Sequence, residues 1–168
     1  LPPPVASYIR KASHIRANTI NTGKSRDFCS LHLHFADNWS LDILNVYNAP
    51  VGSQDTGQGL LQVVQSSPPP WLLVMGDFNC RHTSWDPSTN RSLSSGNPLE
   101  EWAQTYNIHL LNGGIPTHST GGVLDLAWSN VPLMETSVAP YLHTSSDHET
   151  LLTFLPRHEF TDSREKKA

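Results

Sequence analysis

The chain has 168 residues, enough for one domain with its own core, and its 37% hydrophobic and 15% charged residues exclude a disordered or fibrous protein. No apolar run reaches the length that crosses a bilayer, and nothing resembles a signal peptide, so we expect a nuclear or cytoplasmic protein. The formal net charge of −4 excludes a protein that coats nucleic acid by charge alone, so any such contact must be a local site.

In chain order, the alternating residues 5–10 predict a short strand, and the polar residues 11–25 predict a loop. Extended segments follow at 28–35 and 41–47. The turn-like residues between them predict a β-hairpin, which ends at Asn48-Ala49-Pro50 because proline cannot donate to a ladder.

Residues 55–65 predict a short helix, which the Ser- and Pro-rich residues 66–70 end. The continuous apolar run at 71–75 predicts a strand buried on both faces, and the polar residues 76–97 predict a long loop. A second helix is expected to start at Pro98, a favoured first helical position.

Two further strands are expected at 123–128 and 150–155, and residues 157–168 predict a charged tail or linker after a domain at 1–156. Strands and helices alternate irregularly, with hairpins as well as crossovers. This pattern favours a mixed α/β sandwich over a doubly wound sheet.

A polar cluster, Gly76-Asp77-Phe78-Asn79, directly follows the predicted buried strand at 71–75. An acid there is held at the mouth of a sheet, and Asp77 and Asn79 would project to the same side of an extended chain. A carboxylate and a carboxamide so placed can hold and deprotonate a water. The alternative is a simple turn, which these residue types also form.

Two more candidates lie near the later strands. Asp125 sits among apolar residues, where a carboxylate is costly unless it is paired, for instance with a histidine that it orients. The alternative is a side chain that faces solvent. His148, in Ser145-Ser146-Asp147-His148, can donate to a phosphate oxygen or share a proton with a carboxylate, unless the segment is only a turn that begins the strand.

Carboxylates, a carboxamide and a histidine at strand ends suit hydrolysis of a phosphate diester. That reaction needs neutralised charge on the phosphoryl oxygens, a positioned water and support for the leaving oxygen. A divalent cation held by carboxylates would supply much of the first requirement.

The motifs GDFN at 76–79, VLDLAWSN at 123–130 and SSDHE at 145–149, with LNVYNAP at 44–50, resemble signatures of the endonuclease/exonuclease/phosphatase superfamily in the right order. They are most similar to the apurinic-like endonuclease domain of non-LTR retrotransposons. The resemblance implies a DNase I-like α/β fold, a mixed two-sheet β-sandwich flanked by helices. It also implies Mg²⁺ or Mn²⁺ as cofactor, DNA as substrate, and derivation from a reverse transcriptase polyprotein.

The resemblance also implies a role for each matching residue. Asp77 would activate or position the attacking water, with Asn79 as its partner at the water and the phosphate. His148 would be the transition-state histidine and Asp125 its orienting carboxylate. Asp147 would be the acid near the metal and the phosphate, so Asp77, Asn79 and Asp147 are the expected metal ligands.

Four further residues complete the predicted site. Tyr47 would offer its hydroxyl to the phosphate or leaving group, with aromatic packing as the alternative. Thr117 and His118 lie in a Pro-Thr segment that in retrotransposon endonucleases borders the DNA, so they are expected substrate contacts, with an ordinary polar loop as the alternative. Arg81 follows GDFN directly and is placed to meet substrate.

The sequence departs from the family at its start. The family's domain opens with a strand bearing an asparagine, then a helix and a strand bearing the metal-binding glutamate, and Leu1 already lies beyond both. We therefore expect a fold without this strand-helix-strand portion and a polypeptide that is inactive or impaired by itself. Two alternatives stay open: a phosphodiesterase for inositol or lipid phosphates, and an inactive remnant that serves as a binding module.

Overall fold

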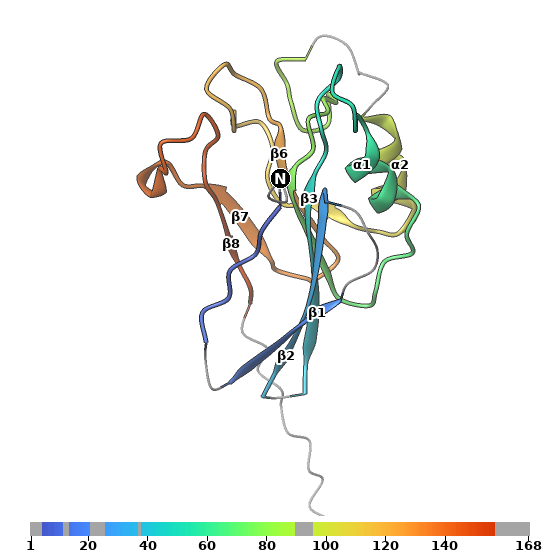
Figure 1. The fold of residues 1–168 in the computed structure, drawn as a ribbon, viewed down its shortest axis with the longest axis vertical. Helices are drawn as coiled ribbons and strands as arrows, with labels where there is room; N and C mark the ends of the chain where they lie inside the picture. Colours follow the sequence, from blue (N-terminus) through green and yellow to red (C-terminus); the bar gives the residue numbers. More distant parts are fainter. Residues whose placement is uncertain (1–4, 12–13, 21–25, 37, 90–95, 157–168) are drawn as a thin grey trace, which may run out of the picture.

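The computed structural model describes residues 5–11, 14–20, 26–36, 38–89 and 96–156, so the predicted tail at 157–168 lies outside the described residues. Figure 1 shows a large sheet with both α-helices on one side and a small sheet on the other. In spatial order, the large sheet consists of β1 (Ile15–Ile20), β2 (Phe28–Phe35), β3 (Ser40–Tyr47), β4 (Leu72–Asp77), β6 (Asp125–Ser129) and β5 (His109–Leu110). The small sheet pairs β7 (Glu135–Val138) with β8 (Leu151–Phe154).

Three helical segments connect these strands: α1 (Gln58–Val64), α2 (Asn97–Thr105) and the short 3-10 helix η1 (Pro140–Leu142). Strands β1, β2 and β3 run antiparallel, whereas β3 and β4 are parallel, because α1 carries the chain back across the sheet. Strand β6 then pairs antiparallel to β4.

The register of these pairs sets the position of three predicted site residues. Tyr47 pairs with Asp77 across β3 and β4, and Asp77 pairs with Asp125 across β4 and β6. Directly opposed residues of neighbouring strands point to the same face of a sheet. Tyr47, Asp77 and Asp125 therefore stand in one row on the face that β7 and β8 cover.

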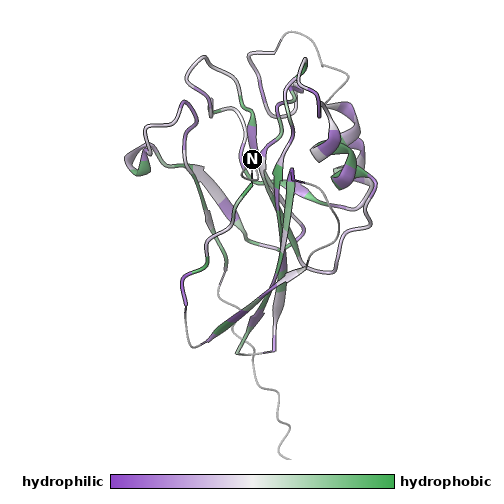
Figure 2. Ribbon diagram, viewed as in Figure 1, coloured by the Kyte–Doolittle hydropathy of each residue, from purple (hydrophilic) through white to green (hydrophobic). Residues whose placement is uncertain are grey.

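The core has one layer on each face of the large sheet. Residues of β3, β4 and β6 pack with α1 and α2 on one face, and Trp39, Leu41, Leu73, Val131 and Met134 form a second cluster on the other. Figure 2 shows the hydrophobic residues along the central strands. Leu72, Leu73 and Val74 of β4 are all buried, which confirms the predicted strand with two covered faces.

Gly76 allows β3 and β4 to approach each other just before the site. Its φ is +146°, and a Cβ atom at this position would lie 1.9 Å from the backbone oxygen of Val46. Any other residue would push the two strands apart. The glycine of GDFN thus sets the spacing at which Asp77 is presented.

Several predicted elements differ from those observed. The predicted hairpin is confirmed, and the two helices form near their predicted places, but residues 5–10 form no strand because they have no ladder partner. Strand β1 lies inside the predicted loop 11–25, and β5 and β7 were not expected. No helix in the described ranges has the length and apolar character to cross a membrane.

Candidate active site

The turn after β4 is built by hydrogen bonds among Asp77, Asn79 and Asn48. The backbone N–H of Asn79 donates to Asp77 Oδ1 at 3.0 Å, and Asn79 Nδ2 donates to Asp77 Oδ2 at 2.7 Å and to the Asn48 backbone oxygen at 3.0 Å. Asn79 adopts a positive φ of 44°, which asparagine tolerates better than most residues. The GDFN segment is thus a turn, as the alternative interpretation expected, and its two polar side chains lie against each other; their role in a site stays a prediction.

Asp125 and His148 form the pair that the sequence predicted. His148 Nδ1 lies 2.8 Å from Asp125 Oδ2, and His148 Nε2 lies 4.0 Å from Asp77 Oδ2. The side chains of Asp77 and Asp125 are only 16% and 15% exposed, so this cluster is mostly shielded from water. A histidine thus stands between two carboxylates, hydrogen-bonded to one and facing the other across a gap.

Backbone contacts between two loops hold His148 in place. The Glu149 N–H donates to the Thr117 backbone oxygen, and the Ser119 N–H donates to the Asp147 backbone oxygen, both at 2.8 Å. The Ser146 hydroxyl accepts from the backbone N–H of His148 at 3.1 Å. The loop before β8 and the loop before β6 therefore form one paired unit beside the row of Asp77 and Asp125.

Thr117 is fully buried, which does not fit the predicted substrate contact. Its hydroxyl oxygen accepts from the backbone N–H groups of Leu124 and Asp125, each at 2.9 Å. A buried side chain engaged in this way cannot reach a substrate from solvent. Thr117 is instead a positioning residue that fixes the start of β6 and the backbone of Asp125.

Arg81 is turned toward the protein as well. Its Nη1 donates to Asp86 Oδ2 at 3.1 Å, and its Nη2 donates to the Gly121 backbone oxygen at 3.4 Å. The Asp86 side chain is 2% exposed, so the guanidinium neutralises a buried acid, while 35% of the Arg81 side chain stays exposed. The predicted substrate contact of Arg81 therefore competes with a structural role.

His118 lies at the rim of the site, next to Asp147 and His148. Its ring contacts the His148 ring edge to face, with centroids 4.7 Å apart, and its Nε2 lies 3.4 Å from Asp147 Oδ2. The Asp147 side chain is 69% exposed. The predicted metal ligands Asp77 and Asp147 thus fall into two separate groups of candidate ligands, which share His148.

Burial and charge shift the pKa values of the central residues. Burial, followed by the Asp125 charge, raises the pKa of Asp77 from 3.8 to about 6, against the hydrogen bonds from Asn79. Burial lowers the pKa of His148, but the hydrogen bond and charge of Asp125 and the charges of Asp77 and Asp147 outweigh it, so the pKa is raised. Asp77 and His148 thus both have shifted pKa values, which are common among residues at functional sites.

Comparison with known proteins identifies the family. Residues 41–152 match the family described as endonuclease-reverse transcriptase, a range that holds nearly all the residues discussed above. The chain belongs to this family. No curated protein matches the chain.

The chain also resembles solved structures. The endonuclease domain of TRAS1, a telomere-specific non-LTR retrotransposon, superposes with a TM-score of 0.67 at 19% identity, over 83% of this chain and 66% of that domain. The Haemophilus ducreyi cytolethal distending toxin (17% identity, 88% of this chain and 60% of that chain, TM-score 0.46) matches less well. So does an endonuclease/exonuclease/phosphatase family protein from Leptotrichia buccalis (12% identity, 84% and 60%, TM-score 0.47). The TRAS1 likeness confirms the predicted two-sheet α/β fold.

The donor set around Asp77 fits a divalent cation of the kind that such a family implies. Asp77, Asp125 and His148 each offer a ligand atom within 4.8 Å of the others. A hollow of about 380 Å³ opens beside Asp125 and is also lined by Glu149. Glu149 Oε2 is buried without a hydrogen-bond partner among the described residues. Two carboxylates and a histidine meet here, and Mg²⁺ or Mn²⁺, which prefer oxygen ligands, would offset the negative charge of the two acids.

Tyr47 and Asn48, at the end of β3, occupy different positions in this site. Tyr47 is half-buried beside Asp77, so its predicted role at the phosphate stays a prediction. Asn48 is buried, donates to the Phe78 backbone oxygen at 2.8 Å and accepts from the Leu60 N–H at 3.0 Å. From the sequence we interpreted Asn48 only as the residue that ends a strand. Its place in the NVYNAP motif could have indicated that it fixes the backbone next to the site.

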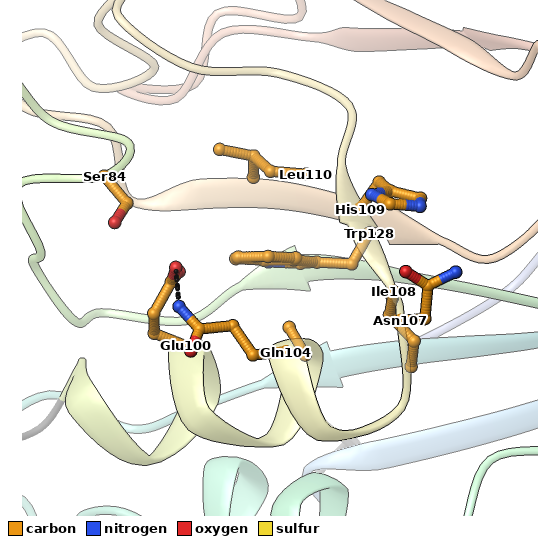
Figure 3. A pocket seen from close by; sticks show the side chains of 9 residues that line it. Ser84, Glu100, Gln104, Asn107, Ile108, His109, Leu110 and Trp128 are labelled. Atoms are coloured by element: carbon orange, nitrogen blue, oxygen red, sulfur yellow. Dashed lines mark hydrogen bonds between the residues drawn. The ribbon is translucent and has the colours of Figure 1, made fainter.

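A second hollow of about 400 Å³ lies away from these residues, between α2 and strands β5 and β6. Figure 3 shows Trp128, Leu110 and Ile108 in it, with Glu100 and Gln104 hydrogen-bonded at its rim. Trp128 and Asp125 are three residues apart on β6, so their side chains point to opposite faces. Trp128 is 3% exposed and belongs to the core.

Proposed function

We propose that this chain carries the acid–base part of a divalent-cation-dependent phosphodiester hydrolysis site that nicks DNA. The observation that carries the proposal is the cluster of Asp125, His148 and Asp77, with His148 Nδ1 2.8 Å from one carboxylate and its Nε2 4.0 Å from the other. A buried carboxylate that orients a histidine is a common way to prepare an imidazole for catalysis. Membership of the endonuclease-reverse transcriptase family supports the reaction class.

In this proposal His148 supports the transition state. The Asp125 carboxylate accepts a hydrogen bond from Nδ1–H, and in the protonated ring Nε2–H can then donate to a phosphoryl oxygen. The raised pKa of His148 keeps that proton available near neutral pH. Hydrogen bonds of this kind are strongest in a shielded site, where water does not compete.

Asp77 and Asn79 position the attacking water. The backbone N–H of Asn79 donates to one oxygen of the Asp77 carboxylate and the side-chain amide donates to the other, which fixes both oxygens in a defined direction. The pKa of Asp77, raised to about 6, suits a group that accepts a proton near neutral pH. Tyr47, next to Asp77 in the register, is proposed to direct its hydroxyl to the phosphate or leaving group.

Mg²⁺ or Mn²⁺ bound here would neutralise charge on the phosphoryl oxygens, with Asp77 and Asp125 as the nearest oxygen ligands and Asn79 and Asp147 as further candidates. Carboxylate number tunes the affinity of such sites. Asp77 already accepts hydrogen bonds from Asn79, and Asp125 accepts one from His148. Because these carboxylates are already engaged, we expect this chain to bind Mg²⁺ weakly. The proposed context is a reverse transcriptase polyprotein.

Nicking of supercoiled DNA in the presence of Mg²⁺ or Mn²⁺ tests the proposal. We expect slow conversion of supercoiled to open-circular plasmid, and a rate reduced roughly 10²–10⁴-fold in His148→Ala, as for loss of a general acid or base. His109→Ala is the matched control, because His109 is an exposed histidine on β5 outside the site.

Three results would contradict the proposal. One is nicking that survives His148→Ala, and another is nicking that is independent of divalent cations. The third is a folded chain without nicking that hydrolyses a phosphoinositide instead. That result would move the same site to inositol or lipid phosphates. Circular dichroism of each variant separates loss of chemistry from loss of fold.

A further inference from the structure

A second ligand group lies on the solvent side of His148. His118, Asp147 and His148 each offer one ligand atom within 4.8 Å of the others. Asp147 is exposed and the two histidines are half-buried, so the group opens to solvent. It shares only His148 with the inner group of Asp77, Asp125 and His148.

The donor types of this group differ from those of the inner cluster. Two of the three donors are imidazole nitrogens and one is a carboxylate oxygen. Mg²⁺ and Ca²⁺ prefer oxygen ligands, whereas Zn²⁺ binds imidazole and carboxylate together. Three protein ligands with one open position are typical of zinc sites that keep a bound water.

Neighbouring groups contact Nδ1 of each ring, and Nε2 of each ring is directed to a carboxylate. The Asp125 carboxylate accepts from Nδ1 of His148 at 2.8 Å, which leaves Nε2 of that ring as the ligand atom. Nδ1 of His118 lies 2.8 Å from the Thr120 hydroxyl, which can accept from it when Nδ1 carries the proton, and its Nε2 faces Asp147 at 3.4 Å. A carboxylate behind a metal-binding histidine fixes the ring and strengthens its ligand nitrogen.

We propose that His118, Asp147 and His148 form a binding site for zinc or a similar borderline divalent cation at the rim of the active site. The Thr120 N–H, which lies 3.2 Å from His118 Nδ1, gives up that contact when Nδ1 carries the proton. Zinc and phosphate would then compete for the same nitrogen of His148. This competition, unlike zinc binding itself, rests on the proposed function.

Titration calorimetry of the 168-residue chain with Zn²⁺ alone, in a non-chelating buffer, tests the site. We expect one zinc ion per folded chain and binding weakened at least about 10-fold in His118→Ala and in Asp125→Asn, a loss of the size seen when the partner behind a ligand is removed. His109→Ala should bind as the unaltered chain does. Co²⁺ should give visible absorption bands of a four-coordinate ion, which His118→Ala removes.

Zinc affinity that is unchanged in His118→Ala would overturn the proposal, because the ion would then lie elsewhere, and unchanged affinity in Asp125→Asn would overturn the role of His148 Nε2 as a ligand held by Asp125. The proposal also fails if the folded chain takes up no zinc, or if millimolar-range Mg²⁺ displaces zinc as readily as more zinc does. A chain that binds zinc through His118 but does not nick DNA would leave this site standing and overturn the proposed function alone.

Discussion

At the scale of single residues, Asp77 combines a proposed catalytic position with an electrostatic cost. It lies within the sheet beside Asp125, and burial and that charge raise its pKa from 3.8 to about 6. A folded-state pKa above the unfolded one means that ionisation opposes folding. Active-site groups often carry such a cost, because they are arranged for chemistry and not for stability.

We therefore predict a pH-dependent effect of Asp77→Asn. At about pH 4 both proteins are nearly neutral at position 77, and the variant only loses a hydrogen bond from Asn79. As the pH rises through about 6, Asp77 ionises at a cost that the variant avoids, so the melting temperature of the variant should rise relative to the unaltered chain. Thermal melts from about pH 4 to about pH 8 measure this difference, and a difference that does not change or falls with pH contradicts it.

A second prediction concerns the proton on His148. Burial lowers its pKa, and Asp125 contributes more than Asp77 or Asp147 to the opposing rise. Asp125→Asn should therefore lower the pKa of His148 more than Asp147→Asn does. A titration of the His148 ring protons by NMR measures both shifts, and the reverse order would be inconsistent with the pairing.

The raised pKa of His148 also makes the stability of the fold depend on pH. Because the folded-state pKa of His148 is raised, its contribution to stability is fully present below its ordinary value of 6.5 and is lost as the pH rises through the folded-state pKa. Asp125→Asn should reduce stability more at low pH than at high pH for this reason.

At the scale of elements, Gly76 controls how β3 and β4 meet. We predict that Gly76→Ala destabilises the fold by about 3 kcal/mol or more, because the added methyl group overlaps the Val46 backbone oxygen. Gly52→Ala is the control, since Gly52 also has a positive φ, +96°, but nothing lies within 4 Å of an added Cβ. That variant should lose only about 1 kcal/mol, the cost of the backbone conformation. Chemical denaturation compares the two, and equal losses would contradict the steric reason.

Elements with a strong local signal were predictable from the sequence. The run of Leu72, Leu73 and Val74 is continuous because both of its faces are covered. Strand β1 gave no such signal, since no helix covers its polar residues and only pairing with β2 makes it a strand. The expected strand at 5–10 failed for the converse reason: it alternates, but it pairs with no strand in the described part of the chain.

The candidate site residues also divide into those with a local sequence signal and those that depend on the tertiary fold. Asp77, Asn79, Asp125 and His148 were recognised because motifs name them, and the register brings the strand-borne ones together. Thr117 was assigned to substrate because burial depends on the tertiary fold and cannot be read from a polar loop. Asn48 was missed because its two backbone partners, Phe78 and Leu60, lie far from it in the sequence.

At the scale of the whole molecule, the site lies where two sheets meet. Asp77 and Asp125 belong to the large sheet, whereas His148 lies just before β8 of the small one. Met134, Leu73 and Val131 pack in the cluster between the sheets. The contact of His148 with Asp125 therefore depends on how firmly the small sheet packs against the large one.

We predict that Met134→Ala and Leu99→Ala each destabilise the chain by roughly 2–5 kcal/mol, the usual cost of a cavity in a core. Only Met134→Ala should also lower the pKa of His148 toward its ordinary value, because it loosens the packing that holds His148 near Asp125. Leu99 lies in the other core layer, on α2. NMR titration of folded samples distinguishes the two, and an equal effect on His148 would show that the sheets respond as a single unit.

The backbone bonds that join the loop of Thr117 to the loop of Glu149 have a consequence for how this rim can diversify. A residue inserted into either loop would shift its half of the pairing and break the match with the other. If these loops are replaced by those of a related protein, both loops should therefore be taken together from that one protein. Replacing one loop alone would displace His118 and His148 relative to each other.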